Sequence, residues 1–284
     1  MIPVEFDYVR PDSVDAAVAA LAAGGEDAKV MAGGQSLMPV LRLRLGAPSL
    51  VVDCSRIDEL TGINVAAGSI TIGAAVTHHT VMTDARIRAG APLLGLATET
   101  VADPAIRHRG TLGGALAHAD PAGDLPAVAV ALDAQFTIAG PSGRRTVGAS
   151  DFFVDYFTTS VNPDEVLVSV TFPILGEGWG YHYEKFNRTA QSWAIVGVAA
   201  AVKVQSKVIA EARVGLTNMG PTPVRASTTE VALVGATSVD EIEAACVHAA
   251  DGTRPTSDLH ADADFREHLA RVLTRRSVAR AAGM

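Results

Sequence analysis

The sequence predicts an α+β fold in which two regions differ in texture. Up to about residue 175, short apolar strands alternate with short helical patterns. After Gly176-Glu177-Gly178, long stretches typical of antiparallel strands precede a run of helices. Two glycine-rich stretches interrupt the first region, residues 32–37 (the first glycine segment) and residues 109–115 (the second glycine segment). We therefore expect a domain boundary near Leu175, and a further division of the first region near Arg56.

Residues 1–56 are predicted to form one small unit of strands and a helix. Asp12 or Ser13 suits the N-cap of this helix, and Gly24-Gly25 suits its end. The expected strands are residues 6–9, 28–31 and 49–53.

Residues 57–175 and 176–284 are expected to form the middle and C-terminal units. In the middle unit we expect strands at 62–66, 69–73, 135–139, 144–147 and 165–172, and helices at 93–101 and 125–132. In the C-terminal unit we expect three strands at 180–186, 194–204 and 208–216, then two or three helices at 224–234, 239–250 and 265–282. The last helix carries five arginines, including Arg266, which form a solvated face or a subunit contact.

The composition argues against several classes of protein, among them nucleic-acid-binding, membrane-spanning and secreted proteins. Hydrophobic residues make up 48% of the 284 residues, and the formal net charge is -8, which argues against a nucleic-acid partner. No window has the length of a transmembrane helix, and the first residues lack the pattern of a signal peptide. The two cysteines, Cys54 and Cys246, suit a reducing compartment and are too few for an iron–sulfur cluster. We expect a cytoplasmic protein, or one peripheral to the inner face of the cell membrane.

The first glycine segment has the features of a phosphate site. It follows a strand-type run and opens a helix, for which Ser36 suits the N-cap. Gly33 and Gly34 expose backbone N–H groups with no side chain in the way, and a helix start favours negative charge. An ordinary tight turn is the alternative. Because the second glycine segment repeats the pattern about eighty residues later, the two together can clamp a diphosphate.

Several common sites do not fit. His78 and His79 suggest a metal site, but adjacent residues on a helix point apart, and no HExxH pattern is present. The chain also lacks a GxGxxG motif after a strand, a phosphate-binding GxxxxGK[ST] loop and a GxSxG nucleophile elbow.

Short motifs spread along the chain resemble one family. They are Ala32-Gly33-Gly34-Gln35-Ser36, Ile72-Gly73-Ala74 with Thr77-His78, Thr111-Leu112-Gly113-Gly114, Asp120-Pro121 with Asp124, and Tyr183-Glu184-Lys185-Phe186. In this order they resemble the FAD-binding medium subunits of molybdenum hydroxylases, the xanthine dehydrogenase and carbon monoxide dehydrogenase group. The resemblance covers essentially the whole chain and is closest to the carbon monoxide dehydrogenase branch.

The resemblance implies a two-lobed FAD-binding domain of the vanillyl-alcohol-oxidase/PCMH type over residues 1–56 and 57–175. It also implies a C-terminal flavoprotein domain over residues 176–284, with a three-stranded antiparallel sheet and helices. The residues implied to bind FAD are Ala32, Gly33, Gly34, Gln35, Ser36, Leu37, Ile72, Gly73, Ala74, Thr77, His78, Val101, Ala102, Thr111, Leu112, Gly113, Gly114, Ala115, Asp124, Leu167, Lys185 and Trp193. No catalytic residue and no metal ligand is expected.

Four of these residues have a plain structural alternative. Asp124 suits a ribityl or ribose hydroxyl, or the cap of the helix that follows it. Leu167 lies beside the isoalloxazine ring or simply in the core. Lys185 stabilises negative charge on the reduced flavin or lies on the surface. Trp193 stands where some relatives have a tyrosine, so it stacks on the ring without a phenol hydroxyl or packs between domains.

The implied function is electron transfer through FAD. A large molybdenum-cofactor subunit and a small [2Fe–2S] subunit would complete the enzyme as a dimer of heterotrimers, with a quinone or NAD as acceptor. Carbon monoxide is the favoured substrate, and xanthine-type heterocycles, nicotine derivatives and aldehydes remain open. One alternative is a self-sufficient flavin oxidase or dehydrogenase that uses a histidine such as His78 or His118 as its base. The other is an interaction subunit that has lost the ligand.

Overall fold

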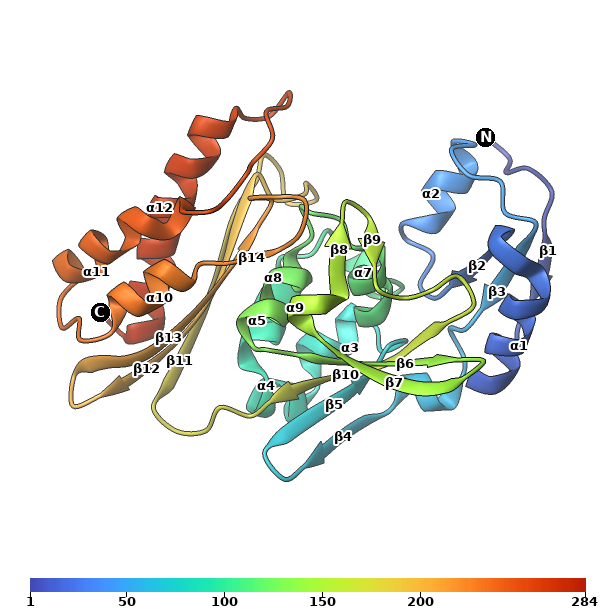
Figure 1. Ribbon diagram of the computed structural model, residues 1–284, viewed down its shortest axis with the longest axis horizontal. Coiled ribbons are helices and arrows are strands. Elements are labelled where there is room, and N and C mark those ends of the chain that lie inside the picture. Colours follow the sequence, from blue (N-terminus) through green and yellow to red (C-terminus); the bar gives the residue numbers. More distant parts are fainter.

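The computed structural model describes residues 1–284, which form three units side by side along the longest axis (Figure 1). The N-terminal unit is a parallel sheet in the order β1-β3-β2, made of β1 (Asp7–Val9), β2 (Ala28–Met31) and β3 (Leu50–Asp53). Helix α1 (Val14–Gly24) packs on this sheet through Val14, Ala17, Val18 and Leu21. The Ser13 hydroxyl caps α1, and Gly25 ends it with a φ of 68°. A short helix, α2 (Leu37–Arg42), follows β2.

The middle unit is built on an antiparallel sheet in the order β4-β5-β10-β6-β7. Its strands are β4 (Ile63–Ala66), β5 (Ser69–Gly73), β6 (Gln135–Gly140), β7 (Gly143–Gly148) and β10 (Val166–Pro173). Its helices are α3 (His78–Thr83), α4 (Ala85–Gly90), α5 (Pro92–Glu99), α6 (Pro104–Arg107), α7 (Leu112–His118), α8 (Asp124–Ala131) and α9 (Ala149–Phe152). A small hairpin of β8 (Phe153–Asp155) and β9 (Thr158–Thr159) follows α9.

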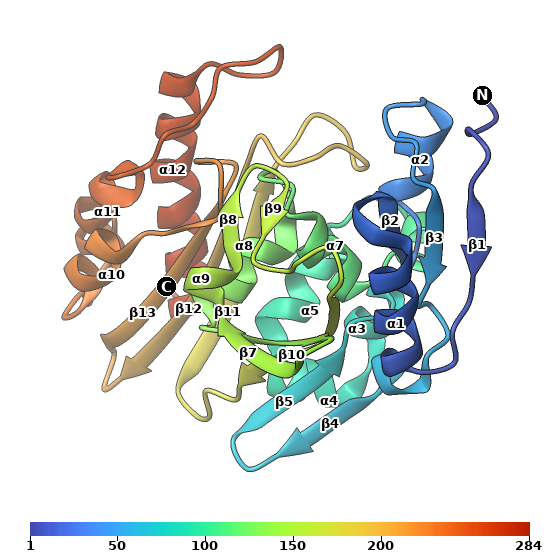
Figure 2. The same cartoon turned by 45° about the vertical axis from the view of Figure 1, so that its right-hand side comes forward.

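The C-terminal unit is a four-stranded antiparallel sheet with helices on its outer face (Figure 2). Its strands are β11 (Trp179–Phe186), β12 (Val196–Gln205), β13 (Val208–Thr217) and β14 (Val224–Arg225). Helices α10 (Ser227–Leu233) and α12 (Ala263–Ala282) contact this sheet, and α11 (Val239–Cys246) packs against both helices. The opposite face of the sheet lies on α5 and α8 of the middle unit.

Strand β12 shows why this sheet is apolar on both faces. Val198 and Val202 belong to the core shared with the outer helices, whereas Ala199 and Ala201 belong to the core of the middle unit. Small side chains face the middle unit because its helix lies very close, and a Cβ on Gly215 of β13 would come within 2.1 Å of the Ala127 carbonyl oxygen. This tight contact holds β13 directly against α8.

The predicted α+β fold class is confirmed, with local differences. Residues 224–225 pair with the edge of β13 as a fourth strand, so the predicted helix begins only at Ser227. The next helix ends at Cys246 and continues as a 3₁₀ turn. Arg266 is buried rather than on a solvated face, because it donates to the Ile195 carbonyl and to Asp258. No helix combines the length and the apolar character needed to cross a membrane.

Candidate functional site

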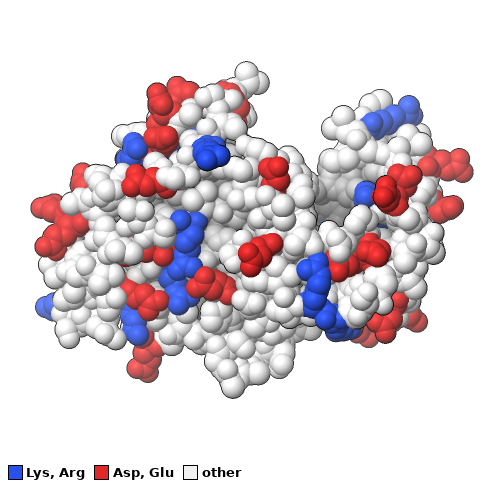
Figure 3. Space-filling model, in the orientation of Figure 1, with Lys and Arg blue, Asp and Glu red and all other residues white.

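A cavity of about 960 Å³ lies where the three units meet, within the usual size range of cofactor sites. Its mouth corresponds to the hollow between the N-terminal and middle units in Figure 3, which also shows acidic and basic side chains interspersed on this face. The walls come from β2 and the first glycine segment, α7, the β8–β9 hairpin, β10, β11 and the loop after β11. A smaller pocket of about 350 Å³ shares Asp120, Phe157, Ser192 and Trp193 with the cavity.

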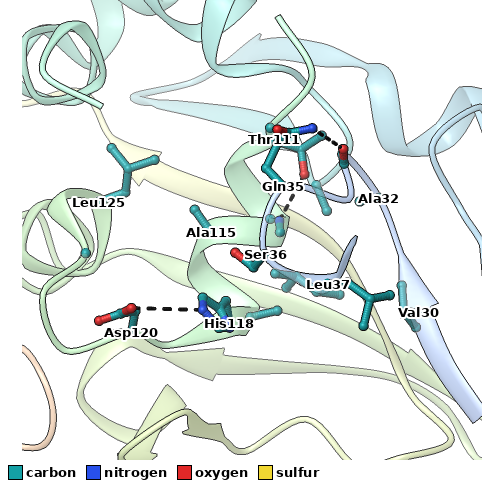
Figure 4. Close-up of a pocket in the computed structure, with 18 of the residues that line it drawn as sticks. Val30, Ala32, Gln35, Ser36, Leu37, Thr111, Ala115, His118, Asp120 and Leu125 are labelled. Atoms are coloured by element: carbon teal, nitrogen blue, oxygen red, sulfur yellow. Dashed lines mark hydrogen bonds and ion pairs between the residues drawn. The ribbon is translucent and has the colours of Figure 1, made fainter. Parts of the chain in front are cut away.

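The first glycine segment lines this cavity and contains a row of free backbone donors. None of the five backbone N–H groups from Ala32 to Ser36 donates a hydrogen bond within the chain. Gly34 has a φ of 72°, the left-handed region that glycine adopts without steric cost. The Gln35 side chain donates to the Gly33 carbonyl at 3.0 Å and so braces the turn (Figure 4). Ser36 occupies the N-cap of α2 but makes no side-chain capping bond, so its hydroxyl is free.

The second glycine segment has a different structure, because residues 112–115 form the first turn of α7. Its backbone donors are satisfied within the chain, since Leu112 donates to the Val76 carbonyl and Gly113 to the Ala74 carbonyl, both at 2.9 Å. The Thr111 hydroxyl caps the helix by accepting from the Gly114 N–H at 3.0 Å. The sequence suggested two equivalent loops, but only the first has a row of free N–H groups.

The two glycine segments touch each other and form one wall. A Cβ on Gly33 would come within 2.1 Å of the Arg109 carbonyl oxygen and 2.7 Å of the Gly110 Cα atom. A Cβ on Gly113 would come within 2.3 Å of the Ala74 Cβ atom. Figure 4 shows the first segment running beside α7. Glycine is therefore required in the first segment for contact between segments, and in the second for contact with the chain behind it.

A buried ion pair forms part of the cavity wall. Lys185 on β11 donates to Asp124 Oδ2 at 2.8 Å and to the Thr100 carbonyl at 3.1 Å. Tyr183, two residues earlier on the same strand, donates to Asp124 Oδ1 at 2.7 Å. Burial raises the pKa of the Asp124 carboxyl, and the Lys185 charge opposes this effect. Asp124 is the first residue of α8 but makes no helix-capping bond, so the capping role considered for it is not observed.

The two adjacent histidines have separate environments. His78 is buried beside Gly110, and burial lowers the pKa of its imidazole to about 4, assisted by the charge of Arg107. Its Nδ1 atom has no hydrogen-bond partner in the chain. His79 instead stacks on His108 with ring centroids 4.1 Å apart. The chain holds no group of three or more side chains placed to bind a metal ion.

Comparison with known proteins identifies the family. Residues 4–175 match the family described as the FAD binding domain in molybdopterin dehydrogenase, and residues 181–281 match the CO dehydrogenase flavoprotein C-terminal domain. The chain belongs to this family. It is an FAD-binding medium subunit of the molybdenum hydroxylase type, an oxidoreductase component whose cofactor is FAD.

Individual relatives match over nearly the full length. The carbon monoxide dehydrogenase medium chain of Hydrogenophaga pseudoflava is 37% identical, over 98% of this chain and 97% of that protein. The 6-hydroxypseudooxynicotine dehydrogenase complex subunit alpha of Paenarthrobacter nicotinovorans is 38% identical, over 99% of this chain and 96% of that protein. The reconstituted CO dehydrogenase from Oligotropha carboxidovorans contains a chain that superposes with a TM-score of 0.97, at 36% identity over 100% of this chain and 99% of that one.

The residues that line the cavity fit FAD. Five free backbone N–H groups suit the acceptor oxygens of a diphosphate, and the glycines there leave no side chain in the way. Val101, Leu125 and Leu167 give the cavity wall apolar surface of the kind that a ring system needs. The Lys185 ammonium is the one buried cation beside this surface.

Most of the predicted FAD-binding residues line this cavity. They are Ala32, Gly33, Gly34, Gln35, Ser36, Leu37, Ala74, His78, Val101, Ala102, Thr111, Gly113, Gly114, Ala115, Asp124, Leu167, Lys185 and Trp193. Ile72, Gly73, Thr77 and Leu112 lie behind the wall. Ile72 and Leu112 are in the core, Gly73 packs on the Leu60 carbonyl, and the Thr77 hydroxyl caps α3.

The structure adds features that the sequence did not reveal. Ala102 has a φ of 43°, and the Arg107 guanidinium fixes this turn by donating to the Val101 and Ala102 carbonyls. The β8–β9 hairpin brings Phe157 to the cavity wall, and nothing in its short sequence indicated that position. Trp193 lines the cavity but is 55% exposed, and its loop is held by a hydrogen bond from the Gln191 amide to Asp103. Tyr183 was part of a recognised motif, but no role followed from the motif.

Proposed function

We propose that this chain is the electron-transfer subunit of a molybdenum hydroxylase. It passes electrons from the [2Fe–2S] clusters of a partner subunit to a quinone or NAD. The observation that carries the proposal is the row of free N–H groups in residues 32–36 within an FAD-binding fold. When bound, FAD exchanges electrons singly or in pairs, which links one-electron clusters to a two-electron acceptor.

The residues of the chain bind and orient the cofactor in this proposal. The N–H groups of Ala32 to Ser36 hold the diphosphate, with the Ser36 hydroxyl as a further donor. Val101, Ala102 and Leu167 exclude water from one end of the cavity. Lys185 places a cation at that end, where it favours the charge that reduction adds. No residue here acts as a conventional acid or base catalyst.

The partners follow from what this chain lacks. A [2Fe–2S] cluster needs four ligands, and the chain has only Cys54 and Cys246, both buried and in different units. We therefore propose a small subunit for the clusters and a large subunit for the molybdenum cofactor, in a dimer of heterotrimers. The names of the relatives, a medium chain and a complex subunit, support a multisubunit enzyme. The cytoplasmic location stays a prediction.

Carbon monoxide is the first substrate to test. Two relatives are medium chains of carbon monoxide dehydrogenases. An equally similar relative comes from an enzyme for 6-hydroxypseudooxynicotine, so nicotine-type heterocycles are the second class to test. In this proposal the large subunit selects the substrate.

The experiment is mild purification of the protein from its native host, with the visible spectrum, metal content and co-purifying polypeptides recorded together. We expect flavin bands, molybdenum, iron and two partner chains, followed by reduction of a dye acceptor with carbon monoxide. A lone yellow protein without metals that turns over an organic substrate would instead establish a self-sufficient flavoenzyme. A colourless protein would contradict FAD binding.

A further inference from the structure

Tyr183 is a buried phenol to which the family motif assigns no role. Its side chain points from β11 toward α8, and the hydroxyl donates to Asp124 Oδ1 at 2.7 Å. The neighbouring strand makes room for it at Gly197, where a Cβ would come within 2.5 Å of the Tyr183 hydroxyl oxygen. Burial raises the pKa of this phenol well above its ordinary value, as does the Asp124 carboxyl, so the hydroxyl stays protonated and acts as a donor.

Asp124 links this hydroxyl to Lys185. Its two carboxylate oxygens are used separately, Oδ1 by Tyr183 and Oδ2 by the Lys185 ammonium at 2.8 Å. The side chains of Asp124 and Lys185 are 2% and 4% exposed, so solvent screens the pair very little. The Thr100 carbonyl takes a second N–H of the ammonium. Lys185 also lines the cavity, so the position and charge balance of this pair act on whatever occupies that end.

We propose that Tyr183 is a positioning residue that sets the redox potential of the flavin. It does so by holding the Asp124 carboxylate that fixes Lys185 at the cavity wall. This inference rests on the proposed placement of the flavin ring beside Lys185.

The direction in which each substitution shifts the redox potential of the flavin follows from the charges around Lys185. Reduction adds negative charge to the flavin, so a cation beside the ring favours reduction and an unbalanced anion opposes it. Without the Tyr183 hydroxyl, the Asp124 carboxylate loses a donor that offsets its charge, and the potential should fall. Asp124→Asn leaves the ammonium unbalanced and should raise the potential. Lys185→Met removes the cation that lines the cavity and should lower the potential most.

The test is the midpoint potential of FAD in protein purified from the native host, followed at the flavin absorption band. Tyr183→Phe keeps the ring volume and should lower the equilibrium constant for two-electron reduction about tenfold, which is about 30 mV. Tyr181→Phe is the matched control, because Tyr181 lies two residues away on the same strand and its half-buried hydroxyl makes no hydrogen bond in the chain. Incorporation of 3-fluorotyrosine at position 183 supplies a stronger donor and should shift the potential upward.

The outcomes separate two kinds of failure. If Lys185→Met and Asp124→Asn move the potential in opposite directions but both changes at Tyr183 leave it unmoved, the role of Tyr183 is refuted. A loss of stability in Tyr183→Phe with an unchanged potential would make Tyr183 a packing residue and would also refute the inference. If neither Lys185→Met nor Asp124→Asn moves the potential, the flavin ring is not beside this pair, and the proposed placement fails.

Discussion

The two glycine segments have similar sequences but opposite hydrogen-bonding roles. In residues 32–36, which line the cavity, the backbone N–H groups are left without acceptors in the chain. In residues 112–114 the corresponding groups donate to Val76, Ala74 and the Thr111 hydroxyl. A pair of glycines therefore does not by itself indicate ligand binding. What matters is whether the rest of the chain supplies acceptors for the N–H groups, since backbone donors are almost always satisfied when buried.

The difference has a structural cause. The second glycine segment runs beside residues 74–78 and pairs with them through an isolated bridge between Thr77 and Thr111. The pairing of β2 with β3 ends at Met31, just before the first glycine segment. No neighbouring strand therefore offers carbonyl groups to this segment. We therefore propose that the first glycine segment contacts the ligand and that the second supports it from behind.

The largest expected effect is at Gly33. In Gly33→Val the side chain would collide with the backbone at Arg109 and Gly110, which would push the first glycine segment away from α7 and abolish FAD retention. The measurement is the ratio of flavin to protein after gel filtration. Gly62→Val is the control, since the nearest atom to its Cβ is 4.0 Å away. Normal FAD content in folded Gly33→Val would refute the role of this segment.

Because His78 is buried behind the second glycine segment, we expect the stability of the protein to depend on pH. Its pKa is about 4 in the folded protein and near 6.5 in the unfolded chain, so the stabilising form is neutral. The folded state is favoured fully above pH 6.5, where the imidazole is neutral in both states. As the pH falls toward 4, the unfolded chain takes up a proton that folded His78 does not, and the free energy of unfolding falls by about 3 kcal/mol. Urea unfolding of His78→Gln should show a smaller loss of stability over this pH window than the unaltered protein. Equal slopes for His78→Gln and the unaltered protein would contradict the prediction.

Gly113 tests whether the second glycine segment serves packing. In Gly113→Ala the methyl group would meet Ala74, and we expect a destabilisation of about 1–3 kcal/mol. The folded fraction should retain FAD, because the Gly113 N–H already donates to the Ala74 carbonyl. The measurements are thermal unfolding and flavin content on the same sample, which separate a packing role of this segment from a ligand-binding role. Loss of FAD at unchanged stability would show that this segment binds the ligand as directly as the first.

Thr111 carries the smallest expected effect. Thr111→Val removes the cap of α7 while keeping the shape of the side chain, and should cost about 1 kcal/mol. Thr111→Ser should restore most of this stability in the same unfolding assay. If Thr111→Val instead weakens FAD binding without changing stability, the hydroxyl contacts the ligand rather than the helix.

Sequence patterns predicted the regular parts of the molecule well. The long strands β11, β12 and β13 and the last helix are apolar and periodic enough to identify alone. The short helices α4, α6 and α7 were not predicted, because four to seven residues carry too little periodic signal. Helix α7 even has glycines as its second and third residues, which are poor helix formers, and tertiary hydrogen bonds hold it.

The sequence by itself determined the fold class, the position of the glycines and the resemblance to FAD-binding subunits. These depend on local composition and spacing, which are read along the chain. The tertiary structure alone decided which glycine segment has free donors, that Asp124 pairs with Lys185 and Tyr183 rather than capping α8, and that His78 is neutral. Each of these depends on acceptors, charges or burial supplied by residues far away in the sequence. A polar group's state is set by its spatial neighbours, and only folding brings those neighbours together.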